Sequence, residues 1–371
     1  MVRRGLVVLI VNLGLLEGLL WTVCPLPSSL QRPVRRAFIQ TLPGLTPRIL
    51  FTEDAFGFRS LSMRAIRKGP RTIRIICLGG STTQQTTQST EDLWSAVLER
   101  HLQAAVRGQG ARIEVAALGQ GGATVLDGVE ECEQVLPPFD PDIVITLWGV
   151  NDLAWHGGPE YHYPDPARHA ATTRWKRTLK RYSQLYRRFR QVEKLVKARN
   201  ALHDGTSIEW ASENVPALRA SYRTYPYRET VLRDPDPIVE FADGTERLIR
   251  CLSRQGRAVI VLGQPVLWKS DLTREEQDAL WFFVNTTEGR VRVSPAWLER
   301  EMARYNDVQR AKAQAQGASY IPLDRLIPKG LPYLYDDCHF TDLGSAAVAE
   351  AIFPVVQTEV ERLMQRRGWK R

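Results

Sequence analysis

The sequence contains few of the residues that build metal sites and disulfide frameworks. It has five cysteines among 371 residues, an odd number whose spacings match neither a zinc site nor a known disulfide framework. Histidine occurs six times, and there is no internal repeat or low-complexity tract. Hydrophobic residues make up 43% of the chain and charged residues 25%, so wholesale disorder is excluded. We therefore expect a globular protein.

The excess of positive over negative charge is confined to one segment. From Arg168 to Asn200 the chain has twelve Lys or Arg and a single acid, Glu193, and without this stretch the net charge of +9 would be close to zero. A local patch of this kind does not predict a nucleic-acid-binding protein. Aromatic and aliphatic residues recur there at helical spacing and predict a cationic amphipathic helix. They are Trp175, Leu179, Tyr182, Tyr186, Phe189 and Val196.

The basic segment lies inside a connection that is too long for an ordinary crossover. It forms part of an insert at about 155–240, between two predicted strands. The insert is interpreted as a cap over the site, a contact with an anionic membrane or glycan, or a helix packed on the domain with a solvated basic face.

Long hydrophobic runs are confined to the N-terminus. Arg3 and Arg4 precede an apolar run from Gly5 to Val23, which is long enough to cross a bilayer as a helix. Residues 1–25 are therefore predicted to be a transmembrane anchor, with a cleaved secretory signal as the alternative. Residues 26–70 are interpreted as a connector and 71–365 as the catalytic domain. We expect that domain to lie outside the cytoplasm, and the oligomeric state stays open.

Five short apolar runs predict the strands of a parallel sheet. They are rich in Ile, Val and Leu and end in Gly, Asn, Asp or Pro, as strands buried on both faces do. The runs lie at 72–81, 112–122, 141–152, 257–265 and 318–324. Helical patterns alternate with them, which favours an α/β fold with a doubly wound parallel sheet. Ligands bind such sheets beyond the carboxyl ends of the strands.

A serine and a histidine with a nearby carboxylate predict nucleophilic catalysis. Ser81 follows Gly79 and Gly80 in the turn after the first strand, and a serine needs a base to take its proton. His339 supplies that base, and Asp336 lies three residues earlier, where it can accept the Nδ1 proton. Asp337 is the competing partner, although adjacent residues face each other less well.

Donors for an oxyanion hole follow the second and third strands. Asn151 comes just after the third strand, where its side-chain amide can donate a hydrogen bond. The glycines of 118–122 follow the second strand and offer backbone N–H groups, and the N–H of Ser81 would be a further donor. Each feature has an ordinary structural explanation as a turn or cap. Their common position at strand ends favours a site.

In this order the residues resemble the SGNH (GDSL-like) hydrolases. "LGGSTT" resembles the first block of that superfamily, "LGQGGAT" the second, "WGVND" the third and "DDCH" the fifth. The resemblance implies a triad of Ser81, Asp336 and His339. It also implies an oxyanion hole of Ser81, Asn151 and Gly122, with Gly119 as the alternative glycine.

The resemblance covers roughly residues 73–354 and has two departures. Gly-Gly-Ser replaces Gly-Asp-Ser in the first block, and Ala117 stands where an Asn is common. Neither change removes a catalytic group. The superfamily adopts a three-layer α/β/α, flavodoxin-like fold, and "FGFRS" at 56–60 resembles the lead-in of membrane-anchored bacterial members. The expected fold is therefore this one, with a five-stranded parallel sheet, the inserted basic helical segment and the N-terminal transmembrane helix.

The function implied is hydrolysis of an acyl ester on a small molecule, a cell-surface glycan or a lipid. The mechanism that the resemblance implies needs no metal and no cofactor. An O-acyltransferase would use the same residues and pass the acyl group to a sugar hydroxyl. A non-catalytic membrane-anchored binding protein would keep the fold without the reaction. A phosphate-binding loop at 78–83 is disfavoured because no lysine follows the glycines.

Overall fold

The computed structural model describes residues 2–23, 34–39, 41–54, 56–155, 183, 185–186, 214–233 and 236–369. The chain divides into two compact units. One comprises residues 1–31 and 163–208, and the other comprises residues 32–162 and 209–371. The second unit contains the main sheet and all the residues of the predicted site.

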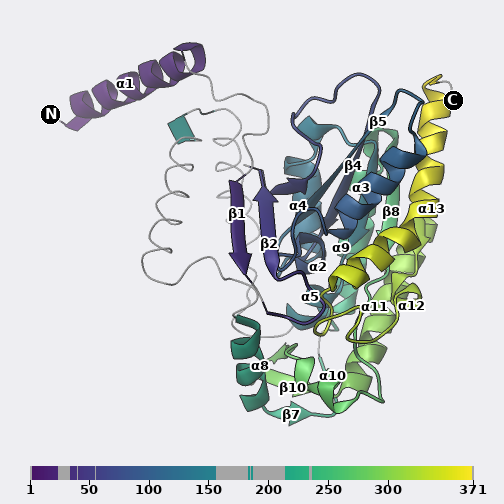
Figure 1. Cartoon of the computed structure of the whole chain (residues 1–371). Helices are drawn as coiled ribbons and strands as arrows, with labels where there is room; N and C mark the ends of the chain where they lie inside the picture. The colour runs from purple at the N-terminus through teal and green to yellow at the C-terminus, as the bar shows by residue number, and fades with distance from the viewer. Residues whose placement is uncertain are drawn as a thin grey trace. The chain divides into compact units, whose positions relative to one another are not determined.

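The main sheet has six strands in the order β11-β8-β6-β4-β5-β3. Three of them, β4, β5 and β8, are labelled in Figure 1. Its strands are β3 (Phe58–Ser60), β4 (Thr72–Gly79), β5 (Arg112–Gly119), β6 (Ile143–Leu147), β8 (Ala258–Leu262) and β11 (Ser319–Ile321). The residues of β4 and β6 are buried throughout, which explains their near-continuous apolar sequences.

The sheet differs from the predicted one by one strand. The five predicted runs contain β4, β5, β6, β8 and β11, which pair in parallel in the flavodoxin-like order 2-1-3-4-5. The sixth strand, β3, pairs antiparallel with β5, so the sheet is mixed and the prediction of five parallel strands was short by one. A strand of three residues is too short to show a period in the sequence.

Helices form two groups. In the first group α3 (Trp94–Ala105) packs on α13 (Asp342–Arg366). In the second, α9 (Ile238–Leu252) packs between α4 (Val125–Gln134) and α11 (Pro295–Ala315). The chain moves one way along the sheet from β4 to β5 and the opposite way from β5 to β11. Right-handed crossovers therefore place the helices on opposite faces, which makes three layers.

Residues interpreted from sequence as a connector form strands. β1 (Val34–Ile39) and β2 (Arg48–Glu53) make an antiparallel hairpin. β2 is hydrogen-bonded to the loop after α2 (Ser81–Gln84), since the Leu50 N–H donates to Ser89 Oγ at 2.9 Å and the Thr90 N–H donates to Leu50 O at 3.0 Å. The hairpin thus supports the loop that comes after the predicted nucleophile.

The remaining elements of the second unit are short. A small sheet has the order β7-β10-β9, with β7 (Tyr227–Arg228), β9 (Val284–Thr286) and β10 (Gly289–Val293). The short helices are α5 (Val150–Trp155), α8 (Asn214–Thr224), α10 (Arg274–Ala279) and α12 (Leu323–Leu326), with 3-10 turns η1 (Pro137–Phe139) and η2 (Arg254–Gly256).

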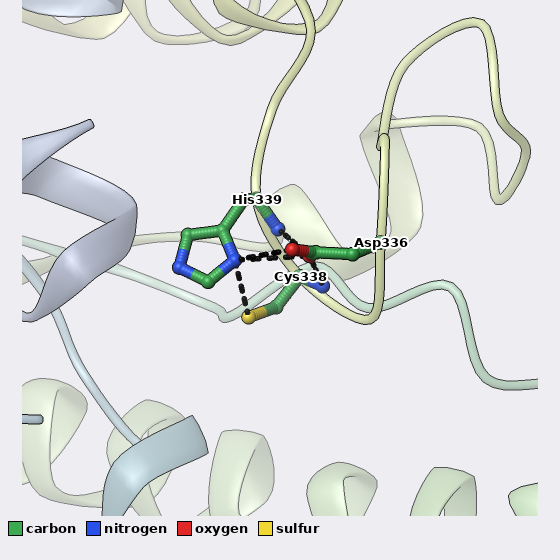
Figure 2. A group of neighbouring side chains, drawn as sticks. All are labelled: Asp336, Cys338 and His339. Atoms are coloured by element: carbon green, nitrogen blue, oxygen red, sulfur yellow. Dashed lines mark hydrogen bonds and ion pairs between the residues drawn. The ribbon is translucent and has the colours of Figure 1, made fainter. Parts of the chain in front are cut away.

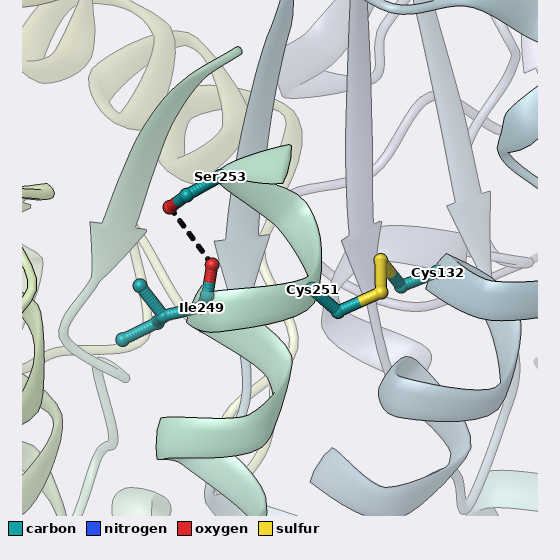
Figure 3. The surroundings of a disulfide bond; sticks show 4 residues. All are labelled: Cys132, Ile249, Cys251 and Ser253. Atoms are coloured by element: carbon teal, nitrogen blue, oxygen red, sulfur yellow. Dashed lines mark hydrogen bonds between the residues drawn. A yellow bond between two sulfur atoms is a disulfide. The ribbon is translucent and has the colours of Figure 1, made fainter. Parts of the chain in front are cut away.

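A disulfide joins α4 to α9 (Figure 3). It links Cys132 and Cys251, which are 119 residues apart in the chain, with a Cα–Cα distance of 6.3 Å. The cysteine spacings gave no sign of this bond, because a pairing across so many residues depends on the packing of the two helices. Of the described cysteines, Cys77 and Cys338 are free and buried.

The N-terminal helix belongs to the first unit. α1 runs over Val2–Val23, and its Glu17 carboxylate accepts hydrogen bonds from Ser183 Oγ at 2.9 Å and Leu185 N at 3.0 Å. Within the described residues, we find no helix with both the length and the apolarity to cross a bilayer, so the predicted transmembrane helix finds no support there. The predicted basic helix from Arg168 to Asn200 lies outside the described residues, apart from residues 183, 185 and 186.

Candidate active site

The predicted nucleophile lies at the edge of the sheet where the parallel strands end. β4, β5 and β6 end in register, with Gly79 opposite both Gly119 and Leu147. Ser81 follows β4 as the first residue of α2. A Cβ atom on Gly79 would lie 2.6 Å from Leu147 O, and one on Gly80 would lie 2.7 Å from Asn151 Nδ2. Both glycines are therefore needed to bring the turn this close to its neighbours.

His339 bridges the serine and the aspartate. Its Nε2 lies 2.8 Å from Ser81 Oγ, and its Nδ1 lies 2.9 Å from each carboxylate oxygen of Asp336. Figure 2 shows the imidazole and the carboxylate pointing toward each other from one loop. Asp336 Oδ1 also accepts the backbone N–H groups of Cys338 and His339, at 3.0 and 2.9 Å. The structure thus brings together the three residues predicted from the D-x-x-H spacing and the first-block serine.

Asp337 does not contact the imidazole. Its Oδ1 accepts the indole N–H of Trp268 at 2.7 Å, and its Oδ2 accepts the backbone N–H groups of Trp281 and Phe282 at 2.7 and 2.9 Å. The competing assignment that the sequence left open is therefore excluded. Burial raises the pKa of Asp337 to about 6, with a smaller contribution from the charge of Asp336.

The histidine and aspartate stabilise each other's charged forms. Burial is the largest single influence on the pKa of His339 and lowers it. The charges of Asp336, Cys338 and Tyr335, together with the hydrogen bond to Asp336, outweigh burial and hold that pKa well above its ordinary value. Burial likewise raises the pKa of Asp336, while His339 and the backbone N–H groups lower it, and the net pKa is below the ordinary value. An imidazole with this partner is a stronger base for the serine proton than an isolated buried one.

Two aromatic rings stack on the imidazole. The Trp281 ring lies 5.8 Å from the His339 ring at an interplanar angle of 8°, and the Tyr335 ring lies 5.7 Å away at 16°. The indole N–H of Trp281 also donates to Asp336 Oδ2 at 2.9 Å. Trp281 was not predicted from the sequence, because it lies 55 residues before Asp336 and has no local signal.

The structure gives a hydrogen bond for one candidate of the oxyanion hole, Asn151, and backbone constraints for the two glycines, Gly122 and Gly119. Asn151 Nδ2 donates one of its two protons to Ala123 O at 2.8 Å. Gly122 has a φ of 76° in the turn after β5, a conformation that favours glycine. Gly119 is needed for close packing, since a Cβ atom there would lie 2.3 Å from the backbone nitrogen of Gln84.

Asp152, the residue after Asn151, has a structural role. Asp152 is fully buried, and its carboxylate accepts the backbone N–H groups of Val125 at 2.9 Å and Gly149 at 3.2 Å. It thereby ties the turn before α4 to the start of α5. Burial raises the pKa of Asp152 to about 7. The G-x-N-D pattern thus provides one side chain at the site and one that supports it.

A buried arginine is hydrogen-bonded to the backbone at the end of α2 and in the loop that follows it. Arg59 of β3 donates to the backbone oxygens of Gln85 and Gln88 at 2.6 and 2.7 Å, and to Gln84 O at the end of α2. Its side chain is 1% exposed, and burial lowers its pKa to about 9. The sequence "FGFRS" resembled a lead-in only, and it gave no indication of this role for Arg59.

The residues around His339 also offer atoms that metals bind. Ligand atoms of Asp336, Cys338 and His339 lie within 4.8 Å of one another. However, His339 Nδ1 is already hydrogen-bonded to Asp336, and burial raises the pKa of the Cys338 thiol, which favours its neutral form. Metal ligation requires a deprotonated thiol and a free ring nitrogen. This donor set fits a hydrogen-bonded triad better than an ion.

A serine, a histidine and an aspartate joined by hydrogen bonds at the carboxyl edge of a parallel sheet form the arrangement that defines serine hydrolases. Comparison of the sequence with known families agrees with this class. Residues 77–347 match the GDSL-like Lipase/Acylhydrolase family, so the chain belongs to that family and is a hydrolase of ester bonds. No curated protein matches the chain.

Several solved structures are similar to the chain at low identity. The acetyl xylan esterase AlAXEase is 16% identical over 76% of this chain and 100% of its own, with a TM-score of 0.42. A carbohydrate acetylesterase family member from Sinorhizobium meliloti is 13% identical over 78% and 99%, with a TM-score of 0.42. A lipase/acylhydrolase from Enterococcus faecalis is 12% identical over 77% and 96%, also at 0.42.

Proposed function

We propose that this hydrolase cleaves acyl esters through a covalent acyl-serine intermediate on Ser81. The observation that carries the proposal is the continuous set of hydrogen bonds from Ser81 Oγ through His339 to Asp336, at 2.8 and 2.9 Å. A serine hydroxyl becomes nucleophilic when a neighbouring base removes its proton as it attacks. His339 Nε2 is within reach to do so, and Asp336 holds the proton on Nδ1.

The reaction then proceeds in two acyl transfers. Ser81 Oγ bonds to the ester carbonyl carbon while its proton passes to His339, and the imidazolium gives that proton to the leaving alcohol. Water then attacks the acyl carbon and loses a proton to His339. The imidazolium returns that proton to Ser81 Oγ as the bond between Oγ and the acyl carbon breaks and the acid leaves. The negative charge on the carbonyl oxygen is proposed to be held by the backbone N–H groups of Ser81 and Gly122 and by the amide of Asn151.

The test of this proposal is the Ser81→Ala variant. It should lose hydrolysis of p-nitrophenyl acetate while its far-UV circular dichroism and melting temperature match those of the wild-type protein. A fluorophosphonate probe should label the wild-type protein at Ser81 and should not label the variant. Hydrolysis by the variant, or a wild-type protein that takes no label, would overturn the assignment of the nucleophile.

The physiological substrate is proposed to be an O-acylated glycan or lipid of the cell surface. A screen of acetyl, butyryl and octanoyl esters of p-nitrophenol measures the acyl preference. Adding sugar acceptors to the same assay separates hydrolysis from transfer, because a transferase would form an acylated sugar in place of the free acid.

We also propose that the domain functions outside the cytoplasm, at the cell membrane. The disulfide between Cys132 and Cys251 supports this location, because such bonds persist in oxidising compartments. Arg3, Arg4 and the apolar run after them have the composition of an export signal or anchor. Fractionation of cells producing the full chain, with mass spectrometry of its N-terminus, would test the location and distinguish a cleaved signal from an anchor.

A further inference from the structure

We propose that Trp281 is a positioning residue that holds both members of the acid–base pair, Asp336 through its indole N–H and His339 through its ring. This inference rests on the proposed function, since it concerns how the triad is held. Trp281 contacts the two residues in different ways, and the two contacts fix different degrees of freedom.

The first contact sets the rotation of the Asp336 carboxylate. Oδ1 is held by the backbone N–H groups of Cys338 and His339, and Oδ2 is held by Trp281 Nε1 at 2.9 Å. Donors on both oxygens keep the carboxylate plane in place while the imidazole gains and loses its second proton. If the indole N–H were removed, His339 Nδ1, at 2.9 Å, would be the one remaining donor to Oδ2 among the residues that the structure describes.

The second contact limits the tilt of the imidazole. The Trp281 ring is nearly parallel to the His339 ring, with an interplanar angle of 8°. Tyr335 adds a second nearly parallel ring at 16°, and its hydroxyl lies 3.1 Å from Thr87 Oγ1. Stacked rings resist rotation of the imidazole about its χ2 bond, which keeps Nε2 directed at Ser81.

The backbone holds Trp281 independently of these contacts. Its N–H donates to Asp337 Oδ2 at 2.7 Å. Arg219 of α8 links the same segment to the histidine loop, since its guanidinium donates to Ala279 O at 3.1 Å and to Tyr335 O at 2.9 Å. The tryptophan is therefore already in position before the imidazole changes its charge.

The chain provides a matched control in Trp268. Its indole N–H donates to Asp337 Oδ1 at 2.7 Å, so it forms the same kind of bond to the adjacent carboxylate. Asp337 makes no bond to His339 in the structure. A substitution of Trp268 therefore removes an equivalent buried hydrogen bond without changing the partner of the imidazole.

The experiment compares Trp281→Phe with Trp268→Phe. Trp281→Phe keeps a ring but removes the N–H, so kcat for p-nitrophenyl acetate should fall about tenfold, which corresponds to ~1.4 kcal/mol, while KM stays near its wild-type value. Without that donor, the negative charge of Asp336 would be stabilised less by its neighbours and would interact more strongly with the imidazolium. The pKa of His339 should therefore rise, and the acid limb of the pH profile should move to higher pH. Trp268→Phe should lower the melting temperature and leave the acid limb in place.

The titration of His339 gives a readout that does not need esterase activity. Asp336, Cys338 and Tyr335 act on the imidazole, and the charge of Asp336 in turn acts on Asp337. All are present in both variants, so a change seen only in Trp281→Phe belongs to the indole. NMR titration, with the His339 signal assigned through His339→Gln, should show a higher pKa in Trp281→Phe. If that variant does not fold, 3-benzothienylalanine at position 281 removes the N–H alone.

An unchanged pKa and an unchanged kcat in the position-281 variant would overturn the positioning role. An equal shift in Trp268→Phe would overturn it as well, because the effect would then be a general loss of packing. If the wild-type protein shows no Ser81-dependent hydrolysis but the NMR shift is seen, the proposed function fails and the contact between Trp281 and the pair stands.

Discussion

Replacing Asp336 by Asn should have a far larger effect on catalysis than replacing its neighbour Asp337. Four N–H groups point at the Asp336 carboxylate: those of Cys338 N, His339 N, His339 Nδ1 and Trp281 Nε1. An Asn side chain has one acceptor oxygen and one NH2 group, so it cannot accept from all of them. The orientation it adopts decides the tautomer of the imidazole.

Two orientations of the amide are open to Asp336→Asn. With the oxygen at the Oδ1 position, both backbone N–H groups keep their acceptor, and the NH2 group faces Trp281 and His339 Nδ1. In the other orientation the NH2 group opposes two fixed backbone donors, at a cost of about 1–3 kcal/mol for each unsatisfied group. The first orientation is therefore favoured. His339 Nδ1 lies 2.9 Å from both oxygen positions, so this orientation no longer fixes the proton on Nδ1. The NH2 group can donate to Nδ1 and leave the proton on Nε2, where the ring cannot accept the proton of Ser81.

The expected loss is about 10⁴-fold in kcat for Asp336→Asn, as for other triads held in the wrong tautomer. In Asp337→Asn the amide oxygen can still accept from Trp281 N and Phe282 N, and only Trp268 Nε1 loses its acceptor. That change should lower the free energy of unfolding by about 1–3 kcal/mol and lower kcat much less.

The pH profile gives a second measure with a defined sign. His339 must be neutral to accept a proton, so activity rises as the pH passes upward through its pKa. Because Asp336 holds that pKa well above the ordinary value of 6.5, the wild-type acid limb should lie above pH 6.5. In Asp336→Asn, burial remains as the main influence on the pKa of His339 and lowers it. The acid limb of the remaining activity should therefore move to lower pH. Equal losses of kcat in the two variants, or a limb that stays in place, would refute the reasoning.

Three further experiments test the supports of the site. Replacing Cys132 and Cys251 together by Ser should lower the free energy of unfolding by about 2–5 kcal/mol, and equal urea midpoints without reductant would contradict this. Arg59→Met should lower kcat at least ~tenfold, since the buried guanidinium holds the carbonyl end of α2. Steady-state kinetics at a temperature where both proteins are fully folded would show this loss. Gly119→Ala would place a Cβ atom 2.3 Å from a backbone nitrogen of α2 and should abolish activity, whereas Gly121→Ala, with its nearest contact at 3.5 Å, should retain it in the same assay.

Residues at strand ends were predictable because sheet geometry brings them together. Once the apolar runs define parallel strands, the positions after them share one edge, and Ser81 and Asn151 fall there. His339 and Asp336 were predictable from their spacing of three residues, which local backbone geometry converts into a contact. The glycine of the oxyanion hole stays a prediction between Gly122 and Gly119.

The missed features depend on packing between distant segments. Cys132 and Cys251 come together only because α4 packs on α9, and no local pattern marks that contact. Trp281 reaches Asp336 across 55 residues, and Arg59 reaches the loop after α2 from a strand of three residues. Such partners are set by tertiary structure, so a single sequence does not show them.

The Cys132–Cys251 bond also determines how the chain responds to being cut. The two cysteines lie on either side of the insert at about 155–240, so the bond joins the part of the chain before the insert to the part after it. A single cleavage anywhere in the insert would leave the two fragments covalently linked. The nicked protein would migrate as one band without reductant and as two bands with it. Whether esterase activity survives that nick would show whether the sheet and triad need an intact insert.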